Sequence, residues 1–432
     1  MIASPDWRGK RFAVLGLARS GVATVRALLA GGAEVLAWDD DKVRRKEIAD
    51  AAVDEGQLFV DDFADWLEIE IDGLVLSPGV PLNRHPVAAK ARAAGVPILG
   101  DIELFAQARA ALPPHKVVGI TGTNGKSTTT ALIHHILQTA DIPSLMGGNI
   151  GLPILAQEPL PEGGVYVLEL SSYQIDLTHT LDCDVAVLLN ITPDHLDRYD
   201  GFEDYAASKA RLFAMQSPDH AAVIGIGDEA SAAIARGLQS HNLTKIAPAA
   251  AMDQSRWPSL QGPHNAQNAL AAIATCEALG IPAAAIEAGL ASFTGLPHRM
   301  ERVVTRNGVA YVNDSKATNP ESTAPALAAF DRIHWIVGGK AKGADLDACR
   351  PHFGHVARAY TIGEAGPLFA SLLRGMMPVE EAGTLAAAVA RAAAQAQPGD
   401  TVLLSPACAS FDQFRDFEQR GDAFRAAVEA LR

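Results

Sequence analysis

The sequence predicts an α/β protein with three domains. Its 432 residues exceed what one hydrophobic core normally supports, which favours several domains. Apolar runs of strand length alternate with stretches of helical spacing along the chain, the pattern expected of mostly parallel sheets. Two adjacent prolines, Pro113 and Pro114, stand directly before a β-branched run and indicate a hinge between two such sheets.

The first domain is expected over residues 1–100. Residues 11–18 form an apolar run that is broken at Gly16. A stretch of helical spacing and a second apolar run follow, and together they indicate a β-α-β unit. Residues 72–80 and 88–101 continue the alternation of strand and helix, as an open parallel sheet requires.

The central domain is expected over residues 101–299 and the C-terminal domain over residues 300–432. The central domain is predicted to have strands at residues 116–120, 165–170 and 185–190, and a helix at residues 265–279. After Pro297 the pattern changes to strand-like segments that again alternate with helical ones, namely RVVTRNGVAYVND, RIHWIVGG, ARAYTIG and TVLLSPA.

The composition is that of a folded protein, and we expect it in the cytoplasm. The net charge of -14 disfavours non-specific binding to nucleic acid or anionic membranes, so an anionic substrate would need a local basic pocket. The four cysteines lie far apart without a CxxC pair, which predicts reduced, packed thiols. No apolar stretch approaches the roughly 18 residues of a membrane span, and the first residues lack the apolar core of a signal peptide.

The segment TGTNGKSTTTALIHHIL, which begins at Thr121, carries the clearest functional signal. It follows a predicted strand and opens a helix, so backbone N–H groups and the helix N-terminus can surround phosphate oxygens. Lys126 would reach the outer phosphates of ATP, and Ser127 would place its hydroxyl on Mg²⁺. The strict phosphate-loop pattern has glycine where this chain has Ile120, and a purely structural turn is the alternative.

The segment GLARSG at residues 16–21 leaves three interpretations open. With Asp39 about twenty residues further on, it imitates a dinucleotide fingerprint, but Ala18 replaces the middle glycine. The segment could bind NAD, bind the diphosphate of another nucleotide, or pack a helix on a sheet.

Further polar residues follow predicted strands. Glu169 ends an apolar strand, where a carboxylate needs water, a partner or a metal ion. His195 follows the next strand; alone it would be an ordinary surface or packing histidine, but the phosphate loop nearby in the sequence favours a functional role. The clusters GPHNAQNAL, LPHRMER and NDSKATNP lie at element ends, where they could meet ligands or only provide caps and turns.

Eight blocks, taken in order, resemble the Mur ligases, and the resemblance covers essentially the whole chain. The blocks are TGTNGKST, GGNIG, ELSSYQ, TPDHLDRY, GPHNAQN, PHRME, NDSKATNP and SPACASFDQF. Within the family, NDSKATNP together with SPACASFDQFRDFEQRGDAF resembles the members that add D-glutamate.

The resemblance implies a fold and an activity. It implies a Rossmann-like N-terminal domain for a UDP-linked substrate, a central P-loop-type ATPase domain and a Rossmann-like C-terminal domain. The implied reaction adds D-glutamate to the L-alanine carboxylate of UDP-N-acetylmuramoyl-L-alanine through an acyl phosphate, forming ADP and phosphate in cytoplasmic peptidoglycan synthesis. The alternative is another Mur or folylpolyglutamate-type ligase with a different amino acid. The implied cofactors are ATP and two Mg²⁺ ions, for which Mn²⁺ could substitute; we expect a monomer without nucleic-acid or membrane partners.

The resemblance also implies residue roles. Lys126, His195 and Lys209 are implied in catalysis. The implied metal ligands are Ser127, Glu169, His195 and Lys209. The implied ATP-binding residues are Gly122, Thr123, Asn124, Gly125, Lys126, Ser127, Thr128, Asn268, Arg299 and Asp314. The implied contacts of the UDP-linked substrate are Arg19, Ser20, Asp39, Ser77, Pro78, Gly79 and Asn149. The implied D-glutamate residues are Lys316, Thr318, Lys342, Ser410 and Phe417.

One implied modification and several departures concern particular side chains. Lys209 matches the lysine that the family carbamylates, whereas without that match it would be a helix-surface lysine. Ala18 and Arg19 stand where many relatives have glycine and leucine, and Asp40 and Asp41 stand where a hydroxyl and a basic residue can occur, so the uridine contacts stay open. Lys340 replaces a common acidic residue near Lys342 and could assist an anionic amino acid or face solvent.

Overall fold

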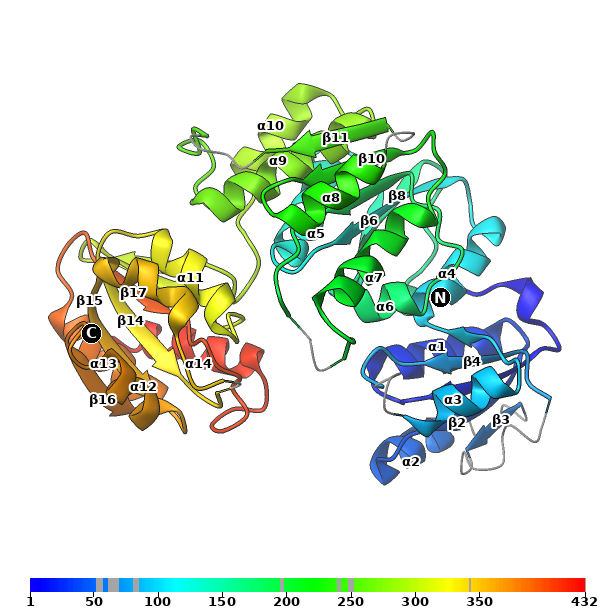
Figure 1. Ribbon diagram of the computed structural model, residues 1–432, viewed down its shortest axis with the longest axis horizontal. Helices are drawn as coiled ribbons and strands as arrows, with labels where there is room; N and C mark the ends of the chain where they lie inside the picture. Colours follow the sequence, from blue (N-terminus) through cyan, green and yellow to red (C-terminus); the bar gives the residue numbers. More distant parts are fainter. Residues whose placement is uncertain are drawn as a thin grey trace. The chain divides into compact units, whose positions relative to one another are not determined.

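The described part of the chain contains three β-sheets with helices packed against them, an α/β architecture (Figure 1). The computed structural model describes residues 1–51, 57–60, 70–80, 85–194, 198–238, 242–247, 252–341 and 343–431. It divides into two compact units. The first contains Met1–Pro248 and Gln267–Gly289, and the second contains Ala249–Ala266 and Leu290–Arg432.

The first sheet is entirely parallel and has the strand order β3-β2-β1-β4-β5. Its strands are β1 (Arg11–Leu15), β2 (Glu34–Trp38), β3 (Leu58–Val60), β4 (Gly73–Leu76) and β5 (Ile98–Leu99). Its helices are α1 (Arg19–Ala30), α2 (Lys42–Ala51), α3 (Pro86–Ala93) and α4 (Asp101–Ala108). The order reverses between β1 and β4, so the loops after these two strands flank the crevice where open α/β sheets bind ligands.

The second sheet is also parallel, in the order β11-β10-β9-β6-β8-β7. Its strands are β6 (His115–Thr121), β7 (Ser144–Gly148), β8 (Gly164–Glu169), β9 (Val185–Leu188), β10 (Ala221–Gly225) and β11 (Asn242–Ile246). The helices are α5 (Lys126–Thr139), α6 (Ser172–Asp176), α7 (Phe202–Ala214), α8 (Glu229–Gly237), α9 (Pro263–Ala278) and α10 (Ala283–Ser292). Because β6 lies between β8 and β9, the segments that follow these three strands meet at one edge.

The first two sheets belong to one compact unit because α4 and neighbouring segments join them. Phe105 on α4 packs edge-on against Tyr166 of β8, with ring centroids 5.1 Å apart. The carboxylate of Glu103 accepts hydrogen bonds from the backbone N–H groups of His179 and Thr180, at 2.7 and 2.9 Å. One cluster of buried apolar side chains extends from Ile2 to the second sheet.

The third sheet forms the centre of the second unit, in the order β12-β13-β17-β14-β15-β16. All neighbours are parallel except β12 and β13. The strands are β12 (Glu301–Arg306), β13 (Val309–Asn313), β14 (Ile333–Gly338), β15 (Val356–Ile362), β16 (Val379–Gly383) and β17 (Thr401–Leu404). The helices are α11 (Pro320–Ala328), α12 (Gly366–Leu373), α13 (Leu385–Gln395) and α14 (Phe417–Glu429).

The α/β class with mostly parallel sheets is confirmed, and so are the main strands predicted in each domain. Sequence patterns did not single out β3, β7, β10, β11 or β16. All of these except β10 are edge strands. In β11 and β16 the residues are polar and partly exposed, so these strands lack the apolar run on which the prediction depended. The exact domain limits at residues 100 and 299 stay predictions. No helix in the described ranges is long and apolar enough to span a membrane.

Candidate functional site

The loop between β6 and α5 has the backbone geometry of a phosphate-binding turn. Gly122 and Gly125 have φ of +147° and +88°, values that L side chains rarely adopt. A Cβ on Gly125 would collide with the amide of Asn268, and one on Gly122 would lie 3.1 Å from the Cβ of Leu189. Helix α5 then begins at Lys126 without a capping side chain, and a helix N-terminus that follows such a turn is a typical anion-binding site.

Asn190, which follows β9, holds this loop in place. Its backbone carbonyl accepts a hydrogen bond from the N–H of Thr123 at 2.8 Å, and its side-chain oxygen accepts one from the N–H of Asn124 at 2.8 Å. The ammonium group of Lys126 donates to the carbonyls of Gly122 and Thr123, at 2.9 and 2.7 Å. The lysine therefore lies over the same turn in which the N–H groups converge. Thr128 lies half-buried in the first turn of α5.

Ser127, Glu169 and Asn149 meet beside the loop, although they come from three different segments. The Ser127 hydroxyl donates to one oxygen of the buried Glu169 carboxylate at 2.5 Å. The side-chain amide of Asn149 donates to the other oxygen at 3.0 Å. The parallel pairing of β7 and β8 aligns Gly148 with Glu169, which brings Asn149 to the carboxylate.

Lys209 reaches the phosphate loop from α7, and its side chain is almost fully buried. Its ammonium group donates to the carbonyl of Gly122 at 3.0 Å, the same oxygen that Lys126 contacts, and lies 4.7 Å from the ring centroid of Tyr205. Burial and the nearby charge of Lys126 hold the pKa of Lys209 well below its usual range. The Tyr205 hydroxyl lies 3.1 Å from that of Thr123, which links α7 to the loop a second time.

The donor types at this point fit a magnesium ion. A serine hydroxyl and a carboxylate beside a phosphate loop are the oxygen ligands that Mg²⁺ prefers. His195, the predicted ligand of a second ion, lies outside the described residues. Within the described ranges, no group of three or more His, Cys, Asp and Glu side chains could hold a metal ion, so a site here would depend on Ser127, Glu169 and added oxygen atoms.

A cavity of about 460 Å³ opens beside the carboxyl ends of β1 and β4. Six of the seven residues predicted to contact the UDP-linked substrate line it: Ser20, Asp39, Ser77, Pro78, Gly79 and Asn149. The seventh, Arg19, donates instead to the carbonyl of Gly151 at 2.9 Å. The departures Ala18 and Asp40 also line the cavity.

Sequence reasoning missed three lining residues with polar side chains, namely Arg44, His85 and Gln174. Arg44 ion-pairs with Asp39 at 3.3 Å, and Asp39 also accepts hydrogen bonds from the N–H groups of Leu17 and Asp41. Burial would raise the pKa of Asp39, but these hydrogen bonds and Arg44 outweigh it and leave the pKa lowered. Gln174 could have been noticed because it closes the block ELSSYQ, whereas only the fold brings Arg44 and His85 to the cavity.

The second unit contains two of the three remaining residues predicted to bind ATP, Arg299 and Asp314. Asp314 is buried after β13; its carboxylate accepts hydrogen bonds from the Ser405 hydroxyl at 2.8 Å and the Met300 N–H at 3.1 Å. Burial raises its pKa to about 7. Arg299 stands between His298 and Met300, both of which have positive φ, so the chain turns sharply there. Asn268 belongs to the first unit, on α9.

Three of the predicted D-glutamate residues, Lys316, Thr318 and Ser410, lie in the segments after β13 and β17 of the second unit, which the buried Arg420 ties together. Its guanidinium donates to the carbonyls of Ser315 and Cys408, at 2.8 and 3.0 Å. Phe417 begins α14. The ammonium group of Lys316 lies 3.8 Å from the ring centroid of Phe417. Thr318 is half-buried and Ser410 is buried, whereas Lys340 is exposed. Lys342 lies outside the described residues.

Comparison with known proteins decides the family. Sequence models of the Mur ligase MurD-like N-terminal domain, the Mur ligase middle domain and the Mur ligase glutamate ligase domain match residues 10–100, 120–257 and 298–408. The chain belongs to the Mur ligase family. The three matches follow one another, so this Mur ligase has all three domains of the family.

Relatives and solved structures of Mur ligases agree with this assignment. The chain is 63% identical to a UDP-N-acetylmuramoylalanine–D-glutamate ligase of Novosphingobium aromaticivorans, over 100% of this chain and 97% of the relative. It is 58% identical to the enzyme of the same name from Zymomonas mobilis, over 100% of both chains. Among solved structures, the MurF ligase of Thermotoga maritima in complex with ADP has a TM-score of 0.61 at 16% identity, over 99% of this chain and 97% of that one. An identity this low supports the fold alone.

Proposed function

We propose that this Mur ligase joins D-glutamate to the L-alanine carboxylate of UDP-N-acetylmuramoyl-L-alanine, with ATP converted to ADP and phosphate. The reaction belongs to the assembly of peptidoglycan precursors in the cytoplasm, and the enzyme acts as a monomer. Relatives at 58% and 63% identity over the full chain bear the name of this activity. The blocks NDSKATNP and SPACASFDQF, which resemble the D-glutamate-adding members, support the same substrate.

The observation that carries the proposal is the position of Asn149. Its side chain lines the cavity proposed for the UDP-linked substrate and also donates to Glu169. Glu169 in turn accepts a hydrogen bond from Ser127, the residue that follows the phosphate-loop lysine. A substrate in the cavity would thus present its far end directly beside the γ-phosphate of an ATP on the loop, which is the geometry that phosphoryl transfer requires.

In the proposed mechanism the alanine carboxylate attacks the γ-phosphorus, and the bond to ADP breaks. The N–H groups at the start of α5 and Lys126 hold the phosphate oxygens during this step. Mg²⁺, when bound by Ser127 and Glu169, would neutralise charge on the phosphates, and the proposed second ion would be held by His195 and Lys209. Asn268, Arg299 and Asp314 would hold the adenosine and the phosphates.

In the second step the amine of D-glutamate attacks the acyl carbonyl, the amide bond forms, and phosphate leaves with the electron pair of its bond to carbon. The amine loses a proton to solvent or to a phosphate oxygen. Lys316, Thr318, Lys342, Ser410 and Phe417 would receive the amino acid. Exclusion of water matters here, because water would hydrolyse the acyl phosphate.

We also propose that Lys209 is carbamylated. The buried amine lies near the ammonium of Lys126, an arrangement that favours its neutral form. A neutral amine can attack carbon dioxide: a nitrogen–carbon bond forms, the amine releases a proton, and a carbamate anion results. The product would exchange repulsion from Lys126 for attraction and supply an oxygen ligand for the proposed second ion.

A phosphate-release assay tests the reaction. UDP-N-acetylmuramoyl-L-alanine and ATP are supplied with a panel of D- and L-amino acids, and the amide product is identified by mass. We expect release only when the UDP-linked substrate and D-glutamate are both present. Equal release without D-glutamate would contradict the coupling, and a preference for another amino acid would favour the alternative ligase of the same superfamily.

A further inference from the structure

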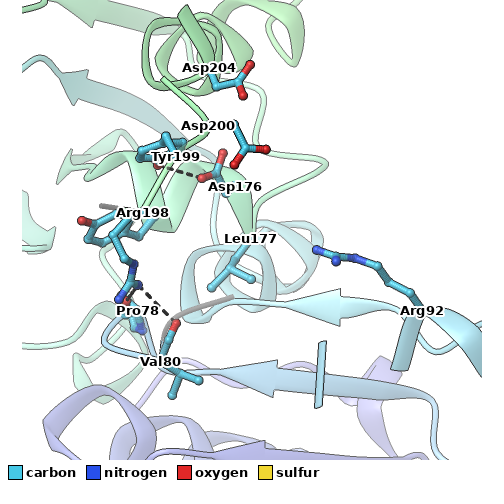
Figure 2. A pocket seen from close by; sticks show the side chains of 10 residues that line it. Pro78, Val80, Arg92, Asp176, Leu177, Arg198, Tyr199, Asp200 and Asp204 are labelled. Atoms are coloured by element: carbon cyan, nitrogen blue, oxygen red, sulfur yellow. Dashed lines mark hydrogen bonds between the residues drawn. The ribbon is translucent and has the colours of Figure 1, made fainter. Parts of the chain in front are cut away.

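A second cavity, of about 330 Å³, adjoins the one proposed for the UDP-linked substrate (Figure 2). The loop after β4, helices α3 and α6, and the segment that leads into α7 line it. Pro78 and Val80 line both cavities, so the loop after β4 forms the wall between them. Gly79, which lies between these two residues, lines only the substrate cavity.

Arg198 holds this wall from the side of the second cavity, and Figure 2 shows its guanidinium directed at the loop. It donates to the carbonyls of Pro78 and Val80, at 3.4 and 3.3 Å. The guanidinium carbon also lies 4.3 Å from the ring centroid of Tyr173, so the group is held between an aromatic face and two carbonyls. On the opposite side, the hydroxyl of Ser77 donates to the carbonyl of Gly16 at 2.7 Å.

The direction of the Pro78 carbonyl determines where the N–H of Gly79 points. The Pro78 carbonyl and the Gly79 N–H belong to one trans peptide, so they point in opposite directions. With the carbonyl turned to Arg198, the N–H turns away from the second cavity. Pro78 has no N–H, and the N–H of Val80 donates to the carbonyl of Ser77 at 2.9 Å. Within the described part of the chain, Gly79 therefore provides the remaining N–H donor of this wall.

We propose that Arg198 is a positioning residue for the substrate: it fixes the peptide between Pro78 and Gly79 so that the Gly79 N–H faces the diphosphate of the UDP-linked substrate. The inference rests on the proposed function for the identity of that substrate. A diphosphate oxygen is a strong acceptor, and the space beside the Cα of Gly79 is open, so an anion can approach this backbone closely. Arg198 itself does not line the substrate cavity and acts through the loop.

The test compares Arg198→Ala and Arg198→Lys with a matched control, Arg92→Ala. Arg92 lines the same second cavity from α3, so its loss removes an equal charge without releasing the wall. For Arg198→Ala we expect the KM of the UDP-linked substrate to rise about tenfold, the loss typical of one hydrogen bond to a charged group. The KM of ATP and the melting temperature should stay unchanged, and lysine should restore part of the loss. Equal rises in both KM values, or the same rise in Arg92→Ala, would overturn the proposal.

A double-mutant cycle tests the route through Gly79. Gly79→Pro removes the N–H donor, and Gly79→Ala keeps it. The loss caused by Arg198→Ala should persist in the Gly79→Ala background and largely disappear with Gly79→Pro. Additive losses would contradict the route through Gly79. If Gly79→Pro does not fold, the positioning role is decided by whether Arg198→Ala raises the KM of the UDP-linked substrate but not the KM of ATP.

Binding of UDP alone, measured by calorimetry, separates this proposal from the proposed reaction. A wild-type protein that binds UDP but does not ligate D-glutamate would count against the reaction only, and the UDP Kd of the variants would still decide on Arg198. A wild-type protein that does not bind UDP would overturn the positioning role.

Discussion

At the scale of single residues, the arrangement of two lysines around one carbonyl is the most informative feature. Lys126 and Lys209 both donate to the oxygen of Gly122, yet they stand on different helices. Two ammonium groups at one acceptor repel each other, and burial adds to the cost of charging Lys209. Lys209 is thereby favoured as a neutral, reactive amine.

This arrangement gives a test of carbamylation. Lys209→Ala should lose nearly all activity, and short-chain carboxylic acids added to the assay should restore part of it, because a carboxylate can occupy the place of a carbamate. Lys126→Ala is the contrast: it should be inactive and should not recover, since a carboxylate cannot replace a cation at the phosphates. The measurement is phosphate release against acid concentration. Absence of recovery in Lys209→Ala at every concentration would argue for a different role.

At the scale of elements, the start of α4 contains a buried carboxyl group that makes stability depend on pH. Asp101 is the first residue of this helix, and burial raises its pKa from 3.8 to about 6. Between these values the folded protein keeps a proton that the unfolded chain has released. The contribution of Asp101 to the free energy of unfolding therefore falls as the pH rises from about 4 to about 6.

Asp101→Asn should remove this dependence. The difference in melting temperature, variant minus wild type, is expected to increase by a few degrees between about pH 4 and about pH 7. Asp219→Asn serves as the control, because that side chain is exposed. A difference that stays constant across the pH range would show that Asp101 does not titrate as its burial implies.

Also at this scale, sequence patterns predicted strands correctly where an apolar run was followed by polar residues of the candidate site, as at β6, β8 and β13. Strands without such a run were missed, and β11 and β16 are examples, because edge strands need only one hydrogen-bonded neighbour and tolerate polar side chains. The GLARSG segment shows that a short pattern can fit several functions. Its pattern allowed three interpretations, and its position at the cavity favours the one in which it binds the diphosphate of a nucleotide.

At the scale of the whole molecule, the net charge of -14 acts on every encounter with a substrate. ATP and the UDP-linked substrate are both anionic, so long-range repulsion should slow their approach at low salt. We expect kcat/KM of the UDP-linked substrate to rise about twofold as ionic strength increases from about 0.01 to 0.1 M, where the Debye length shortens to about 10 Å. The kcat at saturation serves as the internal control. A steep fall of kcat/KM would mean that local cations dominate the approach.

The sequence by itself determined the features that a short contiguous segment can encode. The phosphate loop is one of them, because its glycines, lysine and serine adjoin one another and the preceding strand and following helix are visible beside them. The three-part α/β organisation is another, since it follows from apolar periodicity and length.

Only the tertiary structure decided which distant residues meet. Asn149 reaches Glu169 because β7 pairs with β8, Lys209 reaches Gly122 because α7 packs beside the loop, and Arg198 reaches the wall formed by Pro78 and Val80 across more than one hundred residues of chain. The order of strands in a parallel sheet is set by crossover connections and by the burial of whole faces, and neither is written in a local pattern. The loop could therefore be recognised from its own residues, whereas its surroundings required the fold.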